Sequence, residues 1–444
     1  MGIPFYFVSL IKAHKTIVSR VRTRLEPNIF LLDFNCFLHT YMDDARPIES
    51  ILEALTTLLA DTCSPRTHLY IAMDGLVPYA KISQQRYRRF RIPEVNNPVF
   101  DRNQISPGTP YMKELDLAVR ARFPQAIMSS TDLPGEGEHK LFEWLKTIPP
   151  TERTNTVIYG LDADLILLSL AQESLCSLSL LRENQSFQSK VEGYSTLNIS
   201  DLARKLPMNS QQYVALCVLC FGNDFMPPIG MFSLREGGHD RALECYRQAG
   251  EPDLWTAKGR QVFMQTAQTQ EMKFYTERVK SRDKPAERAI VSADGHHFEA
   301  RYNLHILDGT TNIAQLVGAF WKTFDWTLHY FCENKCLDWN WVYPYPEAPL
   351  VSQLVRYEEI SPIRWTPESP PNFTVTKQLQ FILPHDSLRR AKKRVMFPDE
   401  MYSEETDTRI PWMRRYAWEC EPRISLPLAT EELTSVQSFQ YSLA

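Results

Sequence analysis

Short runs of apolar residues alternate with longer amphipathic segments through the first half of the chain. Three runs are rich in β-branched and aromatic residues, and each ends at or near an acidic residue; they are 29–33, 68–74 and 156–160. The segments between them show helical spacing of their apolar positions; they are 48–60, 111–123 and 139–147. This alternation predicts an α/β layer with a largely parallel central sheet flanked by helices. Ligands of such sheets bind beyond the carboxyl ends of the strands, where the pattern places Asp33, Asp74, Asp162 and Asp164.

The second half of the chain has a different pattern. The stretch 276–298 is polar, charged and interrupted by Pro285, which predicts a linker or exposed excursion. The segment 304–331 is helical in pattern and rich in aromatic residues, and the tail from Pro344 onward is rich in proline and irregular. The chain is therefore expected to divide into a core over 1–275, the charged linker over 276–298, and a smaller aromatic-rich region over 299–444 packed against the core.

Composition limits the class of protein. With 444 residues, 43% of them hydrophobic and 23% charged, the chain is expected to be a soluble globular protein. Its apolar runs are all shorter than the roughly 20 residues that span a bilayer, so we expect no membrane segment. Nine cysteines over this length favour a reducing compartment. Cys217 and Cys220 have C-x-x-C spacing inside an apolar run, which favours core packing over zinc or redox chemistry.

Acidic residues recur in four short motifs. These are Leu-Leu-Asp33-Phe-Asn35, Ala-Met-Asp74-Gly75, Gly-Glu136-Gly-Glu138 with Gly-Leu-Asp162-Ala-Asp164, and Gly222-Asn-Asp224-Phe. Two pairs are spaced i, i+2, which places both carboxylates on one side of an extended segment. Paired like charges persist mainly where a cation neutralises them, and hard oxygen ligands suit Mg²⁺ or Mn²⁺. Two such ions about 4 Å apart can activate water and stabilise the leaving oxygen of a phosphodiester. For any one Asp alone, a role as a helix cap or turn residue is the favoured interpretation, but seven acids with repeated glycine neighbours favour a metal site.

A basic segment begins seven residues after Asp74. It runs Lys81-Ile-Ser-Gln-Gln-Arg-Tyr-Arg-Arg-Phe-Arg91, with five cations and no acid. If it is helical, one face carries Lys81, Gln85, Arg88 and Arg89. Arginine forks and a lysine point charge suit a phosphate with two negative charges. A solvated amphipathic helix is the plain alternative, and the closeness to Asp74 favours the phosphate site. For the second basic run, 389–394, a solvated surface is the better interpretation. The net charge of −4 does not itself indicate nucleic-acid binding, since the acidic motifs offset basic residues elsewhere.

In order and local spacing, these motifs resemble the XRN family of 5′→3′ exoribonucleases. The chain opens with Met-Gly-Ile-Pro, as family members do, and the acidic and basic strings above match the family's. Weaker matches continue through the second half: Trp326-Thr-Leu-His-Tyr-Phe, Trp339-Asn-Trp341-Val-Tyr-Pro-Tyr, Gln378-Leu-Gln-Phe-Ile-Leu-Pro384 and Trp418-Glu419. The spacer after Arg91 is shorter than is usual, and no large C-terminal extension follows. The chain therefore resembles compact members, such as those that some large DNA viruses of eukaryotes encode.

The resemblance implies a fold, an activity and a role for each matching residue. The fold would be a PIN/FEN-like nuclease core with the second conserved region completing an RNA channel. Two Mg²⁺ or Mn²⁺ ions would be held by Asp33, Asp74, Glu136, Glu138, Asp162, Asp164 and Asp224. The 5′-phosphate of RNA would be bound by Lys81, Gln85, Arg88 and Arg89. His39 would stack on the first base with Trp339 on its other face, and Trp326 and Trp341 are the rivals of Trp339.

The implied function is processive 5′→3′ hydrolysis of single-stranded RNA with a 5′-monophosphate, in RNA or mRNA decay. A cytoplasmic monomer is expected, with a nuclear location left open, and the decapping machinery is the expected partner. Two alternatives remain. A structure-specific DNA nuclease of the flap-endonuclease type shares the carboxylate pattern, but the sequence contains no glycine-rich hairpin for duplex binding. A non-catalytic RNA-binding scaffold would be expected to have lost acidic ligands, and all seven are present.

Overall fold

The computed structural model describes residues 2–3, 5–14, 16–90, 99–160, 162–185, 191–282, 285–292, 294–307, 309–357, 365 and 374–395. The chain forms two compact units, and each is described by itself. We call the first the sheet unit; it comprises Leu10–Pro207 and the described part of Ser369–Glu404. We call the second the helical unit; it comprises the start of the chain up to Ser9 and the described part of Met208–Glu368.

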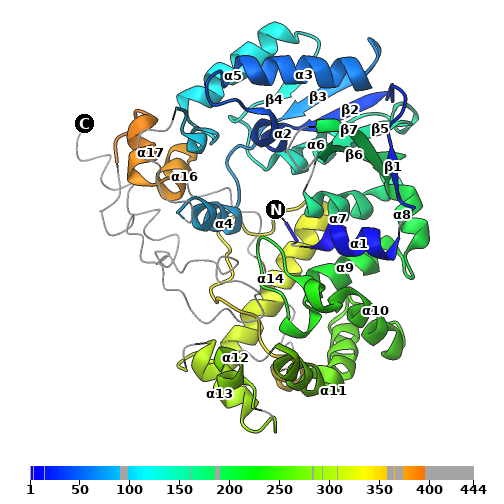
Figure 1. The fold of residues 1–444 in the computed structure, drawn as a ribbon, viewed down its shortest axis with the longest axis vertical. Helices are drawn as coiled ribbons and strands as arrows, with labels where there is room; N and C mark the ends of the chain where they lie inside the picture. The colour runs from blue at the N-terminus through cyan, green and yellow to red at the C-terminus, as the bar shows by residue number, and fades with distance from the viewer. Residues whose placement is uncertain are drawn as a thin grey trace. The chain divides into compact units, whose positions relative to one another are not determined.

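The sheet unit is built on seven strands in the order β1-β7-β6-β5-β2-β3-β4 (Figure 1). The strands are β1 (Val18–Arg20), β2 (Ile29–Asp33), β3 (His68–Ala72), β4 (Ile127–Ser129), β5 (Thr156–Tyr159), β6 (Leu178–Gln185) and β7 (Val191–Asn198). Strands β4, β3, β2, β5 and β6 pair in parallel, whereas β7 pairs antiparallel with β6 and with β1. The predicted α/β fold with a largely parallel sheet is therefore confirmed.

Helices cover both faces of this sheet. Alternating residues of a strand point to opposite faces. Accordingly, Leu69 and Ile71 of β3 belong to the apolar cluster that contains Leu55 of α3 (Glu49–Thr62) and Leu115 of α5 (Pro110–Arg122). Between them, Tyr70 faces the other way, and its ring stacks on Trp144 of α6 (Gly137–Thr147) at 4.6 Å between centroids. The predicted helices 48–60, 111–123 and 139–147 correspond to α3, α5 and α6.

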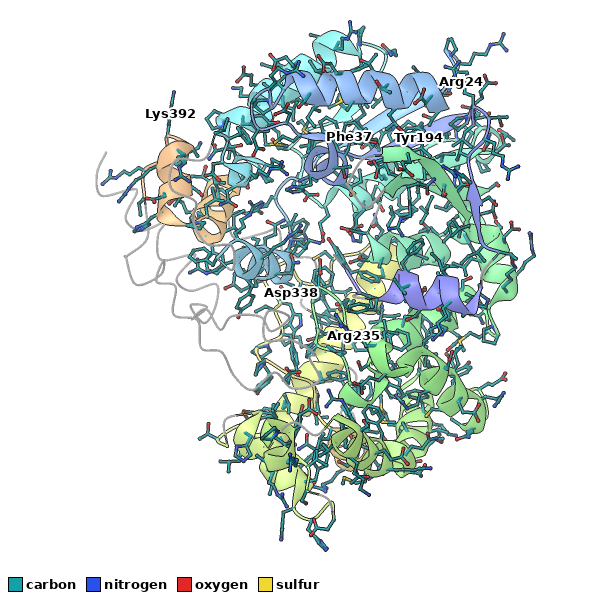
Figure 2. The ribbon with its side chains drawn as sticks, viewed as in Figure 1. Arg24, Phe37, Tyr194, Arg235, Asp338 and Lys392 are labelled. Carbon is teal, nitrogen blue, oxygen red and sulfur yellow. The ribbon has the colours of Figure 1, made fainter. Side chains whose placement is uncertain are left out.

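Further helices of the sheet unit connect the strands or follow them. They are α2 (Phe34–Tyr41), α4 (Tyr79–Phe90), α7 (Ala163–Ala171), α8 (Ile199–Lys205), α16 (Val375–Ile382), α17 (His385–Arg390) and the 3-10 turn η1 (Arg102–Gln104), with α1 (Tyr6–Ala13) spanning the boundary between the units. Figure 2 shows the side chains of this unit, among them Phe37 of α2. Phe37 packs in the same apolar cluster, and its ring contacts that of Tyr159 on β5.

The helical unit contains α9 to α15. Their bounds are α9 (Ser210–Phe221), α10 (Gly238–Gln248), α11 (Ala257–Arg282), α12 (Pro285–Ile290), α13 (Phe298–His305), α14 (Ile313–Glu333) and α15 (Val351–Arg356). Cys217 and Cys220 are fully buried in α9, which confirms the prediction that they pack in a core. No helix in the described part of the chain has the length and apolar character that crossing a membrane requires.

Two segments differ from their predicted character. The stretch 276–298, predicted as a linker, contains the end of α11, all of α12 and the first residue of α13. Arg278 in this stretch is only 5% exposed, and its ion pairs with two carboxylates make the burial of its charge possible. The sequence does not reveal these partners. The tail from Pro344, predicted as irregular, contains α15, α16 and α17. The predicted marker Trp418-Glu419 lies outside the described residues.

Candidate active site

The first acidic side chains follow neighbouring strands. Asp33 is the last residue of β2 and caps α2, and Asp74 follows β3 by two residues. Asn35, two residues after Asp33, holds Asp74 at this place, since its Nδ2 donates to Asp74 Oδ2 at 3.2 Å and its Oδ1 accepts from the Asp74 backbone N–H at 3.1 Å. Because β2 lies between β3 and β5, the carboxyl ends of these three parallel strands meet at one edge of the sheet.

Helix α6 brings two more carboxylates to the same edge. Glu136 precedes its first residue, Gly137, and Glu138 lies in its first turn. The Gly137 N–H donates to Asp74 Oδ1 at 2.7 Å. A Cβ at Gly137 would lie 3.2 Å from Asp33 Oδ1 and 3.4 Å from Asp74 Oδ1, closer than the neighbours readily allow. Glycine therefore lets the start of α6 approach both carboxylates.

Helix α7 adds the last acidic pair of the sheet unit. Asp162 is its N-cap residue, and Asp164 is buried in its first turn. Burial raises the pKa of Asp33 to about 8, helped by the charges of Asp74 and Asp162. Burial likewise raises the pKa of Glu138 well above its usual value, together with the charges of Asp164 and Glu136. Six predicted ligands thus lie close enough to repel one another: Asp33, Asp74, Glu136, Glu138, Asp162 and Asp164.

This donor set has the chemistry of a divalent-cation site. Its oxygens are hard ligands, and a cation would relieve the repulsion that, together with burial, raises the pKa values of Asp33, Asp74 and Glu138. Within the described residues, no three acidic, histidine or cysteine side chains converge closely enough to hold an ion as they stand. Instead Lys81 Nζ forms an ion pair with Glu136 Oε2 at 2.6 Å. The acidic side chains therefore fit divalent cations. In the metal-free protein, Lys81 and backbone N–H groups such as that of Gly137 stabilise their negative charges.

The seventh acidic residue, Asp224, lies in the helical unit. It is half-buried in the turn that follows α9. Gly222 has a φ of +68°, and a Cβ there would lie 2.4 Å from the Pro228 backbone nitrogen, so this turn requires glycine. Asn223 Oδ1 accepts the backbone N–H groups of Phe225 and Met226, which fixes the turn further. The side chain of Asp224 is thus presented from a well-defined loop.

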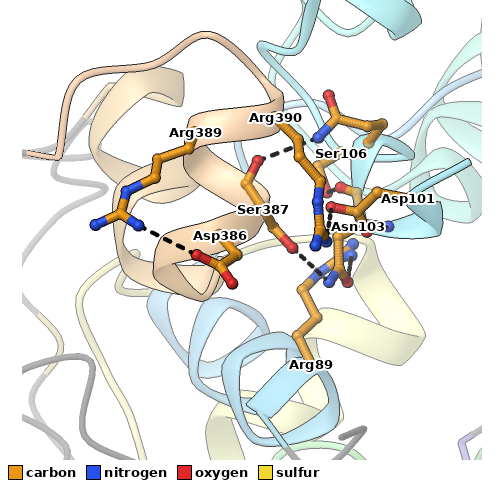
Figure 3. A network of polar contacts seen from close by, with 9 residues as sticks. Arg89, Asp101, Asn103, Ser106, Asp386, Ser387, Arg389 and Arg390 are labelled. Atoms are coloured by element: carbon orange, nitrogen blue, oxygen red, sulfur yellow. Dashed lines mark hydrogen bonds and ion pairs between the residues drawn. The ribbon is translucent and has the colours of Figure 1, made fainter. Parts of the chain in front are cut away.

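The predicted phosphate-binding residues lie on α4, which confirms that the basic segment is helical. Lys81 contacts Glu136 as described, Arg88 is exposed, and Gln85 is half-buried. Arg89 is held by two hydrogen bonds, from Nη1 to Asn103 Oδ1 at 3.0 Å and from Nη2 to the Ile105 carbonyl at 3.1 Å. Asn103 in turn donates to Ser387 Oγ of α17 at 2.9 Å (Figure 3). One edge of the Arg89 guanidinium is therefore fixed by the protein.

Arg86 of the same helix has a different environment. It is 1% exposed, donates to the Phe381 carbonyl at 2.5 Å, and lies over the rings of Phe90 and Phe381. It therefore anchors α4 to α16. Arg86 is thus buried in the protein interior, whereas the four predicted phosphate-binding residues of α4 are half-buried or exposed.

His39 of α2 lies near both the basic helix and the acidic cluster. Burial, together with the charges of Arg88 and Arg89, lowers its pKa to about 4, while the charge of Asp162 acts in the opposite sense. These effects place His39 near both groups of residues. Its imidazole is therefore neutral at neutral pH.

The three candidate tryptophans lie in the helical unit in different environments. Trp326 is fully buried, donates to the Asp338 carbonyl and stacks on Tyr330, so it is a core residue. Trp341 donates to Thr323 Oγ1, and Lys322 lies over its ring at 4.1 Å. Trp339 is half-buried. Core burial removes Trp326 from the rivals, whereas the choice of Trp339 stays a prediction.

Sequence reasoning assigned no role to several residues that shape this site. Asn35 bridges to Asp74, and Lys140 Nζ donates to the carbonyls of Met73 and Ser130 at 2.8 and 3.0 Å. Asn35 lies inside the first acidic motif and Lys140 two residues after Glu138, but only their contacts show what they do. Gln378 belongs to one of the weaker matches to the family, and in the structure it contacts the turn after Asp74.

The sheet and the acidic cluster at its strand ends are those of an α/β, PIN-like nuclease domain. The family model described as XRN 5′-3′ exonuclease N-terminus matches residues 1–98 and 93–184, and the Xrn1 helical domain model matches residues 261–396. The chain belongs to the XRN family of 5′-3′ exonucleases.

Curated relatives agree with this assignment. The 5′-3′ exoribonuclease 2 of Yarrowia lipolytica is 31% identical over 262 residues, which cover 41% of this chain and 26% of the relative. The enzyme of the same name from Cryptococcus neoformans is 31% identical over 376 residues, 56% of this chain and 33% of the relative. The 5′-3′ exoribonuclease 1 of Saccharomyces cerevisiae is 27% identical over 319 residues, 56% of this chain and 21% of the relative. The matches thus span a third or less of these relatives' length.

Proposed function

We propose that the chain is a 5′→3′ exoribonuclease that processively hydrolyses single-stranded RNA with a 5′-monophosphate to nucleoside 5′-monophosphates. The observation that carries the proposal is the ion pair between Lys81 of the basic helix and Glu136 of the acidic cluster, 2.6 Å from Nζ to Oε2. It makes the phosphate-binding helix and the acidic cluster direct neighbours. A terminal phosphate bound on α4 would therefore leave the first phosphodiester near the carboxylates, which accounts for both polarity and release of single nucleotides.

The acidic residues of the sheet unit would hold Mg²⁺ or Mn²⁺, two ions in our proposal. When bound, such ions supply an activated water and stabilise the charge that develops on the phosphodiester oxygens. Asp33, Asp74 and Glu138 have raised pKa values in the metal-free protein, which supports this role. The resemblance also assigns Asp224 to the ligands, and that assignment stays a prediction.

The basic helix would select the RNA end. Lys81 and Arg88 supply positive charge, Gln85 supplies an amide, and Arg89 keeps guanidinium N–H groups beyond the two that the protein fixes. Neutral His39 would stack on the first base, a contact worth roughly 1–3 kcal/mol for any base. Trp339 is proposed as the second stacking partner on the resemblance alone. In this proposal residues 1–275 provide catalysis and residues 299–444 complete the RNA channel.

We further propose that the substrates are products of the decapping machinery, because removal of a cap leaves the 5′-monophosphate that α4 is suited to bind. A monomer is sufficient, since the proposed residues all come from one chain.

Digestion of one 3′-labelled RNA with a 5′-monophosphate, 5′-triphosphate or 5′-hydroxyl end tests the proposal. We expect loss of only the monophosphate RNA with Mg²⁺ and no cutting with EDTA. Equal cutting of all three ends would remove the phosphate pocket from the proposal, and cutting of flap DNA in preference to RNA would replace it with the flap-endonuclease alternative. Intact RNA under all conditions would favour an RNA-binding scaffold.

A further inference from the structure

Gln378 of α16 closes the turn that follows Asp74. Its side-chain Oε1 accepts the Val77 backbone N–H at 3.0 Å, and its Nε2 donates to the Gly75 carbonyl at 3.1 Å. The two bonds fix both ends of the carboxamide, so its orientation is defined by its partners. Gln378 is fully buried, so losing either partner would leave an unsatisfied polar group in the interior.

The same turn is held on a second side by the loop that carries Glu136. The Gly75 N–H donates to the Gly135 carbonyl at 3.0 Å, and the Gly135 N–H donates to the Leu76 carbonyl at 2.6 Å. A Cβ on Gly75 would lie 1.9 Å from the Leu133 carbonyl oxygen, so the two backbone segments are in close contact. The turn 75–77 is therefore clamped between Gln378 and the loop before α6.

This turn also joins the two functional parts of the site. It starts after Asp74, whose Oδ1 accepts the Gly137 N–H at 2.7 Å, and it leads directly into α4. The start of α4 is set immediately beyond it, since the Lys81 N–H donates to the Pro78 carbonyl at 2.9 Å. A shift of the turn would consequently move Asp74 relative to Glu136 and Lys81 together.

We infer that Gln378 is a positioning residue, which sets the place of Asp74 in the acidic cluster and its distance from the basic helix. The inference rests on the proposed function for its catalytic consequence, but its effect on metal binding does not depend on turnover. Residues that orient metal ligands through hydrogen bonds typically contribute roughly 10–100-fold to metal affinity or activity. Gln378 acts in the same way, through the backbone that carries Asp74.

The same helix offers a matched control. Gln380 is 1% exposed, and its Nε2 donates to the Arg394 carbonyl at 2.7 Å, away from the Asp74 turn. Gln378→Met and Gln380→Met both replace a buried amide by an apolar side chain of similar length. A purely structural role predicts equal effects of the two changes on every measurement. A positioning role predicts that only Gln378→Met weakens the site.

The experiment measures Mn²⁺ affinity by the loss of the free-ion EPR signal, together with Tm, kcat and KM on 5′-monophosphate RNA. We expect Gln378→Met to weaken Mn²⁺ binding and lower kcat by about 10-fold or more, with KM little changed and a Tm close to that of Gln380→Met. Gln378→Glu keeps the acceptor for Val77 and should recover part of both losses. It also carries the test if Gln378→Met fails to fold.

Equal Mn²⁺ affinity and kcat in the Gln378 variants and in Gln380→Met would overturn the inference. If the wild-type protein cleaves no RNA, the proposed function fails, and the Mn²⁺ affinities alone still decide the role of Gln378.

Discussion

Single residues of the acidic cluster are held in an unfavourable electrostatic environment. Glu138 shows this, because burial and the charges of Asp164 and Glu136 all raise its pKa. Groups that repel one another in the metal-free state are usually retained for binding and chemistry. Removing one of these charges should therefore lower the catalytic activity without lowering the stability of the metal-free protein.

Glu138→Ala should abolish turnover without destabilising the metal-free protein. The loss of activity should exceed the roughly 10–100-fold that is typical of residues outside the ligand shell. RNA digestion gives the first effect, and thermal unfolding in EDTA gives the second. A large fall in Tm in EDTA would show instead that Glu138 supports the fold, and Asp164→Ala should behave in the same way as Glu138→Ala.

Arg88→Ala should remove the preference for a 5′-monophosphate over a 5′-hydroxyl end. Arg88 is exposed, so its loss should leave Tm unchanged, and it should also raise the pKa of His39, which the Arg88 charge lowers. Competition between the two RNAs measures the preference, and NMR titration measures the histidine. Arg120 of α5, an exposed arginine paired with Asp116, is the control. An unchanged preference in Arg88→Ala would take α4 out of end recognition.

At the level of elements, buried charges explain where prediction from sequence failed. Arg278 of α11 contacts Glu236 at 2.9 Å and Glu287 of α12 at 2.7 Å, and Glu287 is 1% exposed. In the sequence these residues look like a solvated charged stretch, because pairing partners are not visible there. The strands 29–33 and 156–160 were predictable because their apolar runs are continuous and end at or near acidic residues.

Removing Arg278 should destabilise the helical unit strongly. Arg278→Met leaves the Glu287 carboxylate buried without its cation, which typically costs about 3–5 kcal/mol. Adding Glu287→Leu to Arg278→Met should restore much of the stability, since an apolar pair of similar volume avoids the uncompensated charge. Urea unfolding of the single and double variants measures both effects. A double variant no more stable than Arg278→Met would show that the pair contributes through packing alone.

For the whole molecule, the sequence predicts the sheet and the order of the motifs but not which distant segments meet. Four acidic residues and α4 could be placed together because parallel strands share an edge and α4 follows Asp74 directly, whereas Glu136 and Glu138 were assigned to the site through the family resemblance. The pairing of Gln378 with the Asp74 turn could not be predicted, because the contact joins residues 301 positions apart. The helices α16 and α17 are short, and their apolar residues are buried by packing on the sheet unit.

The stability of the metal-free molecule should depend on pH through Asp33. Its folded pKa is raised from 3.8 to about 8, so its contribution is fully present below pH 4 and is lost as the pH rises through about 8. Each pKa unit corresponds to ~1.4 kcal/mol. In EDTA, Asp33→Asn should therefore gain Tm relative to wild type between pH 5 and pH 8, and Mg²⁺ should reduce that difference at pH 8. A Tm difference that does not vary with pH would contradict the assigned shift.

The contact between Gln378 and the Asp74 turn also has a consequence for protein synthesis. A ribosome adding about 5–20 residues per second needs roughly 15–60 s to proceed from one partner to the other. From the addition of Asp224 until the addition of Gln378, the growing chain carries every acidic motif but lacks the amide that closes the turn. The Asp74 turn therefore stays without its closing amide until 301 further residues have been added after Val77.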